Sequence, residues 1–510
     1  MIRGILTVGG WTLGSRVLGF LRDMLIAAVM GAGPLADAFF VALKLPNLFR
    51  RLFGEGAFNA AFVPSFAATL TVAGMAQARA LAERMATLMT LWLALLTGLG
   101  IVFMPQLLRV LAPGFVDEPL RFQLAVELTR ITFPYLVFIC LTALISGVLN
   151  GLDRFAAAAG APVLFNLLSM GSLFALTPFV ATPGHALAWG VTISGVAQLI
   201  LVWVAAARAG MPLAIISRPR LSPEVRDVLR KMGPGLIGAG VTQLNLAVDV
   251  IIASLLPAGA VSYLYYADRI GQLPLGVIGA AVSTAMLPLL AKQLRGGKPL
   301  SAHRSMNRAL ELSLALALPA AAAQAALAWP IITALFQRGA FGAEAAAATS
   351  HALTAYAVGL PAFILVKAYL PGFFARGDTA TPVKIGLAAV ALNLALNLAL
   401  TPWLQHVGIA LATSLSAWAN TAALALILRR RGHWHADKRV RRNVPRLLVA
   451  TLAMAAVLLV LRMAMPDPGG STARIVVLAI YVAAGLVTYF GTAHLTGALP
   501  LGELRRLRRR

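Results

Sequence analysis

The chain has 510 residues, of which 59% are hydrophobic and only 12% are charged. Soluble globular proteins carry about 25% charged residues, so this composition excludes a soluble protein and predicts an all-α polytopic membrane protein. The net charge of +25 comes from 43 Lys and Arg against 18 Asp and Glu. These basic residues lie mostly in short loops between apolar stretches, which is typical of cytoplasmic loops and indicates no nucleic-acid partner.

Apolar stretches recur along the whole chain, and each is long enough to cross a bilayer core about 30 Å thick. Gly, Pro and charge clusters divide them into about fourteen predicted transmembrane helices. In chain order these are residues 5–30, 35–68, 78–112, 121–149, 158–180, 184–207, 226–256, 260–293, 304–336, 345–375, 382–402, 406–429, 444–464 and 472–498. The first stretch is interrupted by charges and lacks a small-residue cleavage site, so we expect a retained helix rather than a signal peptide.

The basic loops predict the orientation. Lys and Arg gather in residues 208–231, 292–308, 429–446 and 505–510, which all fall on one side in the alternating count. The opposite loops are short and carry acids such as Asp117, Glu344 and Asp467. The positive-inside rule makes the basic side cytoplasmic, and an even number of helices then places both termini in the cytoplasm.

A duplication is visible within the chain. The segment from Asp23 to Phe40 matches the segment from Asp249 to Tyr266 at an offset of 226 positions. Pro64 then pairs with Pro288, and Pro134 with Pro361, at nearly the same offset. We therefore predict an N-terminal six-helix lobe at 1–210, a C-terminal six-helix lobe at 211–432, and two extra helices with a basic tail at 433–510. Because six is even, the two lobes form a parallel repeat, as in alternating-access transporters with a central cavity.

Arginines inside the predicted spans are the candidate binding residues: Arg16, Arg22, Arg50 and Arg269. One arginine at the centre of a spanning helix costs roughly 2.5–3.5 kcal/mol, so four of them indicate a wet or ligand-filled cavity and an anionic cargo. Arginine stays charged and binds phosphate oxygens with a planar fork, and we expect Ser15 and Asn47 to assist. In the alternative interpretation, these arginines snorkel or pair internally with counter-ion or gating residues, namely Asp23, Asp37, Glu55 and Asp268.

The second predicted helix is too polar and too broken to face lipid. It carries Lys44, Pro46, Asn47 and Arg50 before a Gly-Glu-Gly sequence. Such breaks are tolerated at membrane depth where the freed backbone faces a cavity or packs within protein, so a bend is expected here. A proline kink without functional meaning is the alternative.

A second polar set consists of Asp249, Asn393, Asn397 and Thr413. A carboxylate with amide and hydroxyl oxygens is a reasonable shell for a hard monovalent cation such as sodium. Hydrogen bonding between helices is an equally good interpretation. Apart from this sodium ion, the sequence indicates no cofactor.

The runs Ser15-Arg-Val-Leu-Gly-Phe-Leu-Arg-Asp23 and Ala36-Asp-Ala-Phe-Phe-Val-Ala-Leu-Lys44 resemble the MurJ (MviN) family, as do Tyr265-Tyr-Ala-Asp-Arg269 and Pro371-Gly-Phe-Phe-Ala-Arg376. The similarity covers essentially the whole chain. It implies a lipid II flippase of the multidrug/oligosaccharidyl-lipid/polysaccharide exporter superfamily in the bacterial inner membrane. It also implies that the four arginines bind the lipid II headgroup and that the last two helices form a groove for the lipid tail.

The expected function is therefore transport of lipid II to the outer leaflet for peptidoglycan synthesis. The resemblance implies lipid II, membrane lipids and cell-wall synthesis proteins as partners of a monomer. A drug/cation antiporter or a polysaccharide-intermediate exporter of the same superfamily is the alternative. A polyprenyl-phosphate glycosyltransferase is less well supported, because the acids lie beside arginines instead of near the membrane surface. The sequence contains neither a phosphate-binding Gly-Lys-Ser/Thr loop nor a His-Glu-x-x-His motif, so we expect that the protein is not an enzyme.

Overall fold

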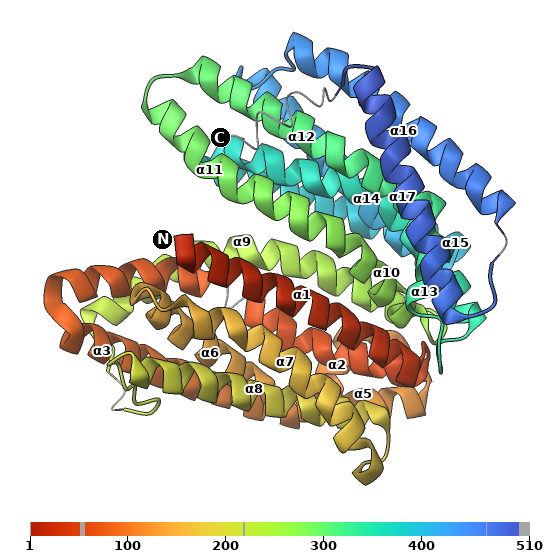
Figure 1. The fold of residues 1–510 in the computed structure, drawn as a ribbon. Coiled ribbons are helices and arrows are strands. Elements are labelled where there is room, and N and C mark those ends of the chain that lie inside the picture. The colour runs from red at the N-terminus through yellow and green to blue at the C-terminus, as the bar shows by residue number, and fades with distance from the viewer. Residues whose placement is uncertain (1, 52–56, 218–219, 466, 499–510) are drawn as a thin grey trace. The chain divides into compact units, whose positions relative to one another are not determined.

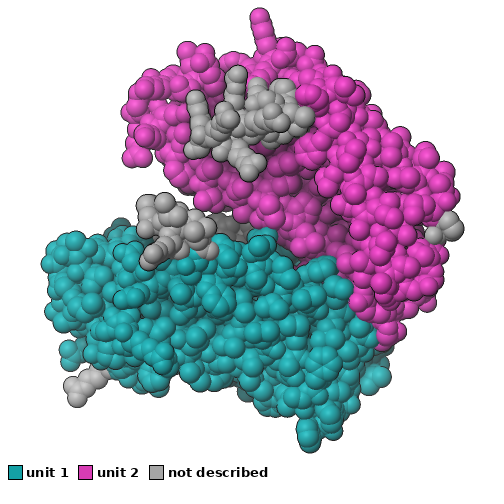
Figure 2. All heavy atoms as spheres, in the orientation of Figure 1, with its two compact units in different colours: residues 1–262 teal, residues 263–510 magenta. Residues whose placement is uncertain are grey.

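The computed structural model describes residues 2–51, 57–217, 220–465 and 467–498. Every regular element in these ranges is helical, which confirms the predicted all-α fold class (Figure 1). Ten of the described helical segments are long and apolar enough to cross a bilayer. The chain forms two compact units, residues 1–262 and residues 263–510 (Figure 2).

Unit 1 is a bundle in which α1 packs against α7, α7 against α8, and α2 against α5. Its elements are α1 (Ile2–Met30), α2 (Pro34–Arg50), α3 (Ala57–Val102), α4 (Met104–Leu111), the 3-10 helix η2 (Pro113–Asp117), α5 (Pro119–Thr132), α6 (Tyr135–Gly151), α7 (Phe155–Ala175), the 3-10 helix η3 (Thr177–Phe179), α8 (Pro183–Arg208) and α9 (Pro223–Ser254). Part of its core is a row of aromatic rings on α3, with Phe62 lying 5.0 Å from Phe58 and 5.7 Å from Phe66 between ring centroids.

Unit 2 follows from α10, which begins at the end of unit 1. Its elements are α10 (Ala260–Pro274), whose first three residues still belong to unit 1, the π-helical turn η4 (Leu275–Gly279), α11 (Ala280–Arg295), α12 (Pro299–Ala326), α13 (Ala328–Leu335), α14 (Ala343–Phe374), α15 (Ala380–Arg430), α16 (Lys438–Ala464) and α17 (Ser471–Leu495). The last two helices lie side by side, and they pack on α12 and α13 (Figure 1).

The predicted apolar stretches coincide with these helices, but several are divided differently. The backbone leaves the helical conformation at Gly74 in α3 and at Gln405 in α15. The break at Gln405 separates two predicted helices, 382–402 and 406–429. A hydrogen bond between Asn393 and Thr413 joins these two halves across 20 residues, so they run antiparallel. The number of membrane crossings and the division into lobes at residues 210 and 432 remain predictions.

Prolines inside the helices explain several long-range contacts. A proline lacks an N–H and leaves the carbonyl four residues earlier without its helical partner. In a membrane, such a carbonyl must find a donor within the protein. Side chains of other helices supply these donors: Thr132 to the Ala42 carbonyl (3.1 Å, before Pro46), Gln324 to Ile270 (3.2 Å, before Pro274), and Tyr489 to Ala315 (2.6 Å, before Pro319).

Apolar side chains also cover outward faces of the helices. Along α3, Trp92, Leu95, Leu99 and Val102 recur at helical spacing and are between 49% and 65% exposed. The same pattern continues on α16, where Leu452 is 68% exposed. Soluble proteins rarely expose such continuous apolar surface, so these faces fit contact with lipid tails.

Candidate functional site

Arg22 lies in a buried polar cluster on α1. The Arg22 side chain is only 9% exposed, and its Nη2 and Nε donate to Asp23 Oδ1 at 2.8 and 3.2 Å. Its Nη1 donates to Oδ1 of Asn166 on α7 at 3.1 Å. The Phe165 ring lies beneath the guanidinium, 5.3 Å away from centroid to Cζ. A buried cation is costly unless it is paired and hydrogen-bonded, and this cluster satisfies both conditions.

Asn166 connects Arg22 to a second point on α1. Its Nδ2 donates to the Ser15 carbonyl at 3.0 Å and lies 3.5 Å from the Ser15 hydroxyl. Ser15 and Arg22 are seven residues apart, which places them on the same face of α1 two turns from one another. The predicted residues Ser15, Arg22 and Asp23 are therefore brought together, by an asparagine that the sequence analysis did not single out.

The other predicted arginines occupy different surroundings. Arg16 is exposed on α1, whereas Arg50 is partly buried at the last residue of α2. Asn47 lies one turn before Arg50 and donates from Nδ2 to the Leu43 carbonyl at 2.8 Å. Pro46 lies inside α2, which ends at Arg50, and the predicted bend stays a prediction. Glu55 lies outside the described residues.

Arg269 lies on α10 in unit 2 and is held by the tyrosine one turn before it. Its Nη2 donates to the Tyr265 hydroxyl at 2.7 Å, and its Cζ lies 4.7 Å from the centroid of that ring. Asp268 is exposed and accepts a hydrogen bond from Gln272 at 3.2 Å. The hydrogen bond and the cation–π contact orient the Arg269 guanidinium. Convergence of this arginine with those of unit 1 remains a prediction.

Asp37 is fully buried and belongs to a cluster at the start of α2. Its partner is Arg121 of α5, whose Nη2 lies 2.6 Å from Asp37 Oδ2. The backbone N–H groups of Gly259 and Ser262 donate to the same carboxylate at 2.7 and 2.8 Å, and the Ser262 hydroxyl donates as well. Asp37 therefore ties α2 and α5 to the first turn of α10 and is the counter-ion of an arginine outside the predicted set.

Both missed residues left a signal in the sequence. Arg121 is a basic residue at the predicted outer end of a helix, where the positive-inside rule disfavours cations. Asn166 is an amide inside a mostly apolar predicted span, where polar side chains are expensive and usually have a partner. Neither signal identifies that partner, because Arg121 and Asp37 are 84 residues apart and Asn166 and Arg22 are 144 apart.

The second polar set is partly brought together in unit 2. Asn397 Nδ2 donates to Asn393 Oδ1 at 2.8 Å, Asn393 Nδ2 donates to Thr413 Oγ1 at 3.3 Å, and Thr413 donates to the Ile409 carbonyl. Asp249 belongs to unit 1 and is partly buried. Among the residues described, no three His, Cys, Asp or Glu side chains form a metal-binding group. Amide and hydroxyl oxygens suit sodium, so a bound sodium ion stays a proposal, and hydrogen bonding between the helices is the other interpretation of these side chains.

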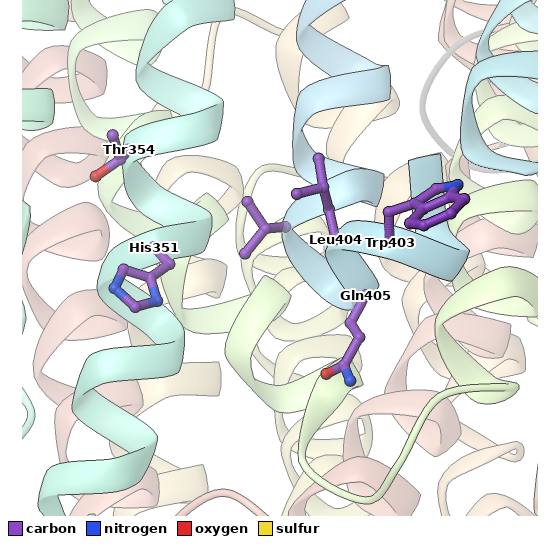
Figure 3. A pocket seen from close by; sticks show the side chains of 6 residues that line it. His351, Thr354, Trp403, Leu404 and Gln405 are labelled. Carbon is purple, nitrogen blue, oxygen red and sulfur yellow. The ribbon is translucent and has the colours of Figure 1, made fainter. Parts of the chain in front are cut away.

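Unit 2 also has an open pocket at the break in α15 (Figure 3). Its volume is about 500 Å³, and His351 and Thr354 of α14 face Leu404, Gln405 and Val407 across it. Gln405 has a positive φ of 49°, which allows the abrupt reversal between the two halves of α15. Trp403 projects from the same turn and is 87% exposed. An exposed indole at such a turn is typical of the membrane–water interface. The pocket is lined mostly by residues of this turn, so the reversal of α15 accounts for it without a ligand.

Comparison with known proteins identifies the family. The family model described as "Lipid II flippase MurJ" matches residues 26–479. The chain is 44% identical to a probable lipid II flippase MurJ of Rhizobium meliloti, covering 99% of this chain and 96% of that protein. It is 37% identical to the lipid II flippase MurJ of Burkholderia cenocepacia, covering 90% of this chain and 89% of that protein. The chain belongs to the MurJ family.

Solved structures support the same fold. A lipid II flippase MurJ in an inward closed conformation matches with a TM-score of 0.80 and 23% identity, over 96% of this chain and 98% of that one. An inward-facing multidrug resistance MATE transporter of the MOP superfamily matches with a TM-score of 0.67 and 16% identity, over 82% of this chain and 94% of that one. The predicted fold and family are confirmed, and the drug-exporter and glycosyltransferase alternatives are not favoured.

Proposed function

We propose that this protein moves lipid II from the inner to the outer leaflet of a bacterial cytoplasmic membrane for peptidoglycan synthesis. Membership of the MurJ family supports this proposal, because its curated relatives are named as lipid II flippases. The structural observation that carries it is the buried Arg22, which is held between Asp23 and Asn166 within an apolar bundle. The diphosphate of lipid II is an anion that a guanidinium binds well.

The cluster around Arg22 suggests how a charged headgroup enters the membrane region. A free arginine at this depth would cost several kcal/mol, and Asp23 offsets that cost when no cargo is bound. A phosphate group can replace the carboxylate because both present oxygens to the same N–H donors. Cargo binding then exchanges one anion for another at Arg22, and the displaced Asp23 carboxylate, which is only 2% exposed, has to take up a proton or another hydrogen-bond donor.

Alternating access requires an outer barrier that opens. The Asp37 cluster supports this part of the proposal, since it joins the starts of α2 and α10 with Arg121 of α5. In the predicted orientation these helix ends lie on the outer side. Breaking this tie is proposed to accompany the outward-open state in which lipid II is released.

Transport by the purified protein in liposomes tests the function. We expect wild-type protein to translocate lipid II and Arg22→Ala or Arg269→Ala to abolish translocation, because each variant removes a permanent cation. Arg79→Ala is the matched control, since Arg79 is 45% exposed and forms its ion pair with Glu83 one turn along the same helix. Normal transport by both variants would remove these arginines from the mechanism.

Cargo identity requires a separate experiment. Mass spectrometry of lipids that copurify with the protein should detect lipid II, and enrichment of a polysaccharide-linked polyprenyl lipid would favour the exporter alternative. Chemical turnover of radiolabelled lipid II by the protein alone would revive an enzymatic function. We further propose a monomer with both termini in the cytoplasm, which native mass spectrometry and reporter fusions at each terminus can test.

A further inference from the structure

Asn166 occupies a place that suits a role in cargo binding. It is 5% exposed, it lies on α7, and its side chain fits between two turns of α1. Its amide oxygen faces the Arg22 guanidinium, and its amide nitrogen faces the Ser15 carbonyl. These two contacts need one acceptor and one donor in a fixed plane, which an asparagine supplies and which determines the orientation of the amide.

Gly19 allows α1 to approach this amide. It lies between Ser15 and Arg22, and a Cβ at this position would lie 3.5–3.8 Å from Nδ2, Oδ1 and Cγ of Asn166. A methyl group would lie in van der Waals contact with the amide, so little free space separates α1 from Asn166. Ser15, Gly19 and Arg22 therefore form one face of α1 that is shaped around Asn166.

The hydrogen bonds from Arg22 to Asp23 and to Asn166 leave from two different edges of the guanidinium. Nε and Nη2 form the edge that binds carboxylate or phosphate oxygens side by side, and both donate to Asp23. Nη1 lies on the other side and donates to Asn166. An anion can therefore replace Asp23 while Asn166 keeps its own bond to Arg22.

We propose that Asn166 is a positioning residue for cargo binding: it fixes the Arg22 guanidinium so that its Nε–Nη2 edge exchanges Asp23 for the diphosphate of the cargo. This inference rests on the proposed function. Asn166 acts through Arg22, so its loss changes cargo affinity without removing the cation itself. A neutral amide serves here because an acid would compete with phosphate for the same arginine.

The test compares Asn166→Ala, Asn166→Asp and Ser169→Ala in full-length protein in nanodiscs. Asn166→Ala removes a hydrogen bond to a charged group, so we expect lipid II affinity to fall by about ten- to hundredfold. Asn166→Asp keeps the size of the side chain but adds a second carboxylate beside Arg22, so we expect a larger loss. Ser169→Ala is the control, because Ser169 is 1% exposed on the same helix. We expect the Ser169→Ala protein to bind lipid II with wild-type affinity.

A merely structural role for Asn166 predicts a different order. It would make the smaller alanine variant the more damaging one and would lower thermal stability together with affinity. If both Asn166 variants bind lipid II normally while Arg22→Ala does not, the positioning role is wrong and the flippase function stands. If wild-type protein neither binds nor transports lipid II, the proposed function fails as well. Because Asn166→Asp preserves volume, it keeps the test possible if the alanine variant misfolds.

Discussion

Replacing Asp37 should loosen the start of α10. Asp37→Ala leaves Arg121, which is 1% exposed, without its 2.6 Å partner. It also leaves the N–H groups of Gly259 and Ser262 without the acceptor they now share. Removing one member of a buried ion pair costs about 3–5 kcal/mol. If the tie exists only in the outward-closed state, that cost shifts the equilibrium towards outward-open by roughly a hundredfold or more.

Thiol labelling from the outer side can measure this shift. Val261 is 4% exposed beside Ser262, so Val261→Cys in a Cys140→Ser background reports on opening at this point. We expect Asp37→Ala to raise the labelling rate by a membrane-impermeant maleimide by at least about tenfold. Glu118→Gln is the control, because Glu118 is 46% exposed and its 3.3 Å contact with Arg121 is worth little.

A double variant separates the pair from its surroundings. Asp37→Asn combined with Arg121→Gln removes both charges, so it should be less damaging than the sum of the two single variants. An unchanged labelling rate in Asp37→Ala, or strict additivity in the double variant, would refute the claim that this ion pair holds the start of α10.

Three further outcomes follow from particular contacts. Tyr489→Phe removes the donor to the Ala315 carbonyl at 2.6 Å, and we expect a lower apparent Tm from a loss of about 1–3 kcal/mol; an unchanged Tm would contradict this. The pKa of Asp378 lies at about 2, below its ordinary 3.8, chiefly because the Thr381 backbone N–H donates to it. A carboxyl group whose pKa is lowered by folding stabilises the fold at pH values above its ordinary pKa, and this stabilisation is lost as the pH falls towards the pKa in the folded protein. The Tm of the wild type should therefore exceed that of Asp378→Asn by less and less between about pH 5 and pH 2. A Tm difference that stays constant over this range would contradict the prediction. Sodium should raise the Tm relative to choline at equal ionic strength, and Asp249→Asn should abolish that rise; stabilisation that persists in the variant would exclude Asp249 as a ligand.

The sequence predicted the membrane class, the helical stretches and the family, because apolar length and basic loops are local properties. It also singled out Arg22 and Asp23 as candidates, and these two are neighbours in the chain. It did not predict where Asp37 would find its partner, since Arg121 lies 84 residues away and pairing depends on how α2 packs against α5. The hydropathy pattern predicted a loop between residues 402 and 406, whereas the structure shows an abrupt turn at Gln405 with a positive φ.

Arg22 and Arg121, two buried arginines of unit 1, differ in which contacts would be lost if another anion replaced their carboxylate partner. Arg121 is bound to a carboxylate on another helix, and that carboxylate also accepts from Gly259 and Ser262, so displacing it would separate α2 from α5 and α10. Arg22 is bound to the carboxylate of the next residue, so displacing it breaks a bond within α1. Replacement by phosphate therefore breaks a bond within one helix at Arg22, whereas at Arg121 it breaks bonds that join α2, α5 and α10. The same chemistry suits Arg22 to cargo binding and Arg121 to holding helices together, although the sequence presents both as arginines near a membrane span.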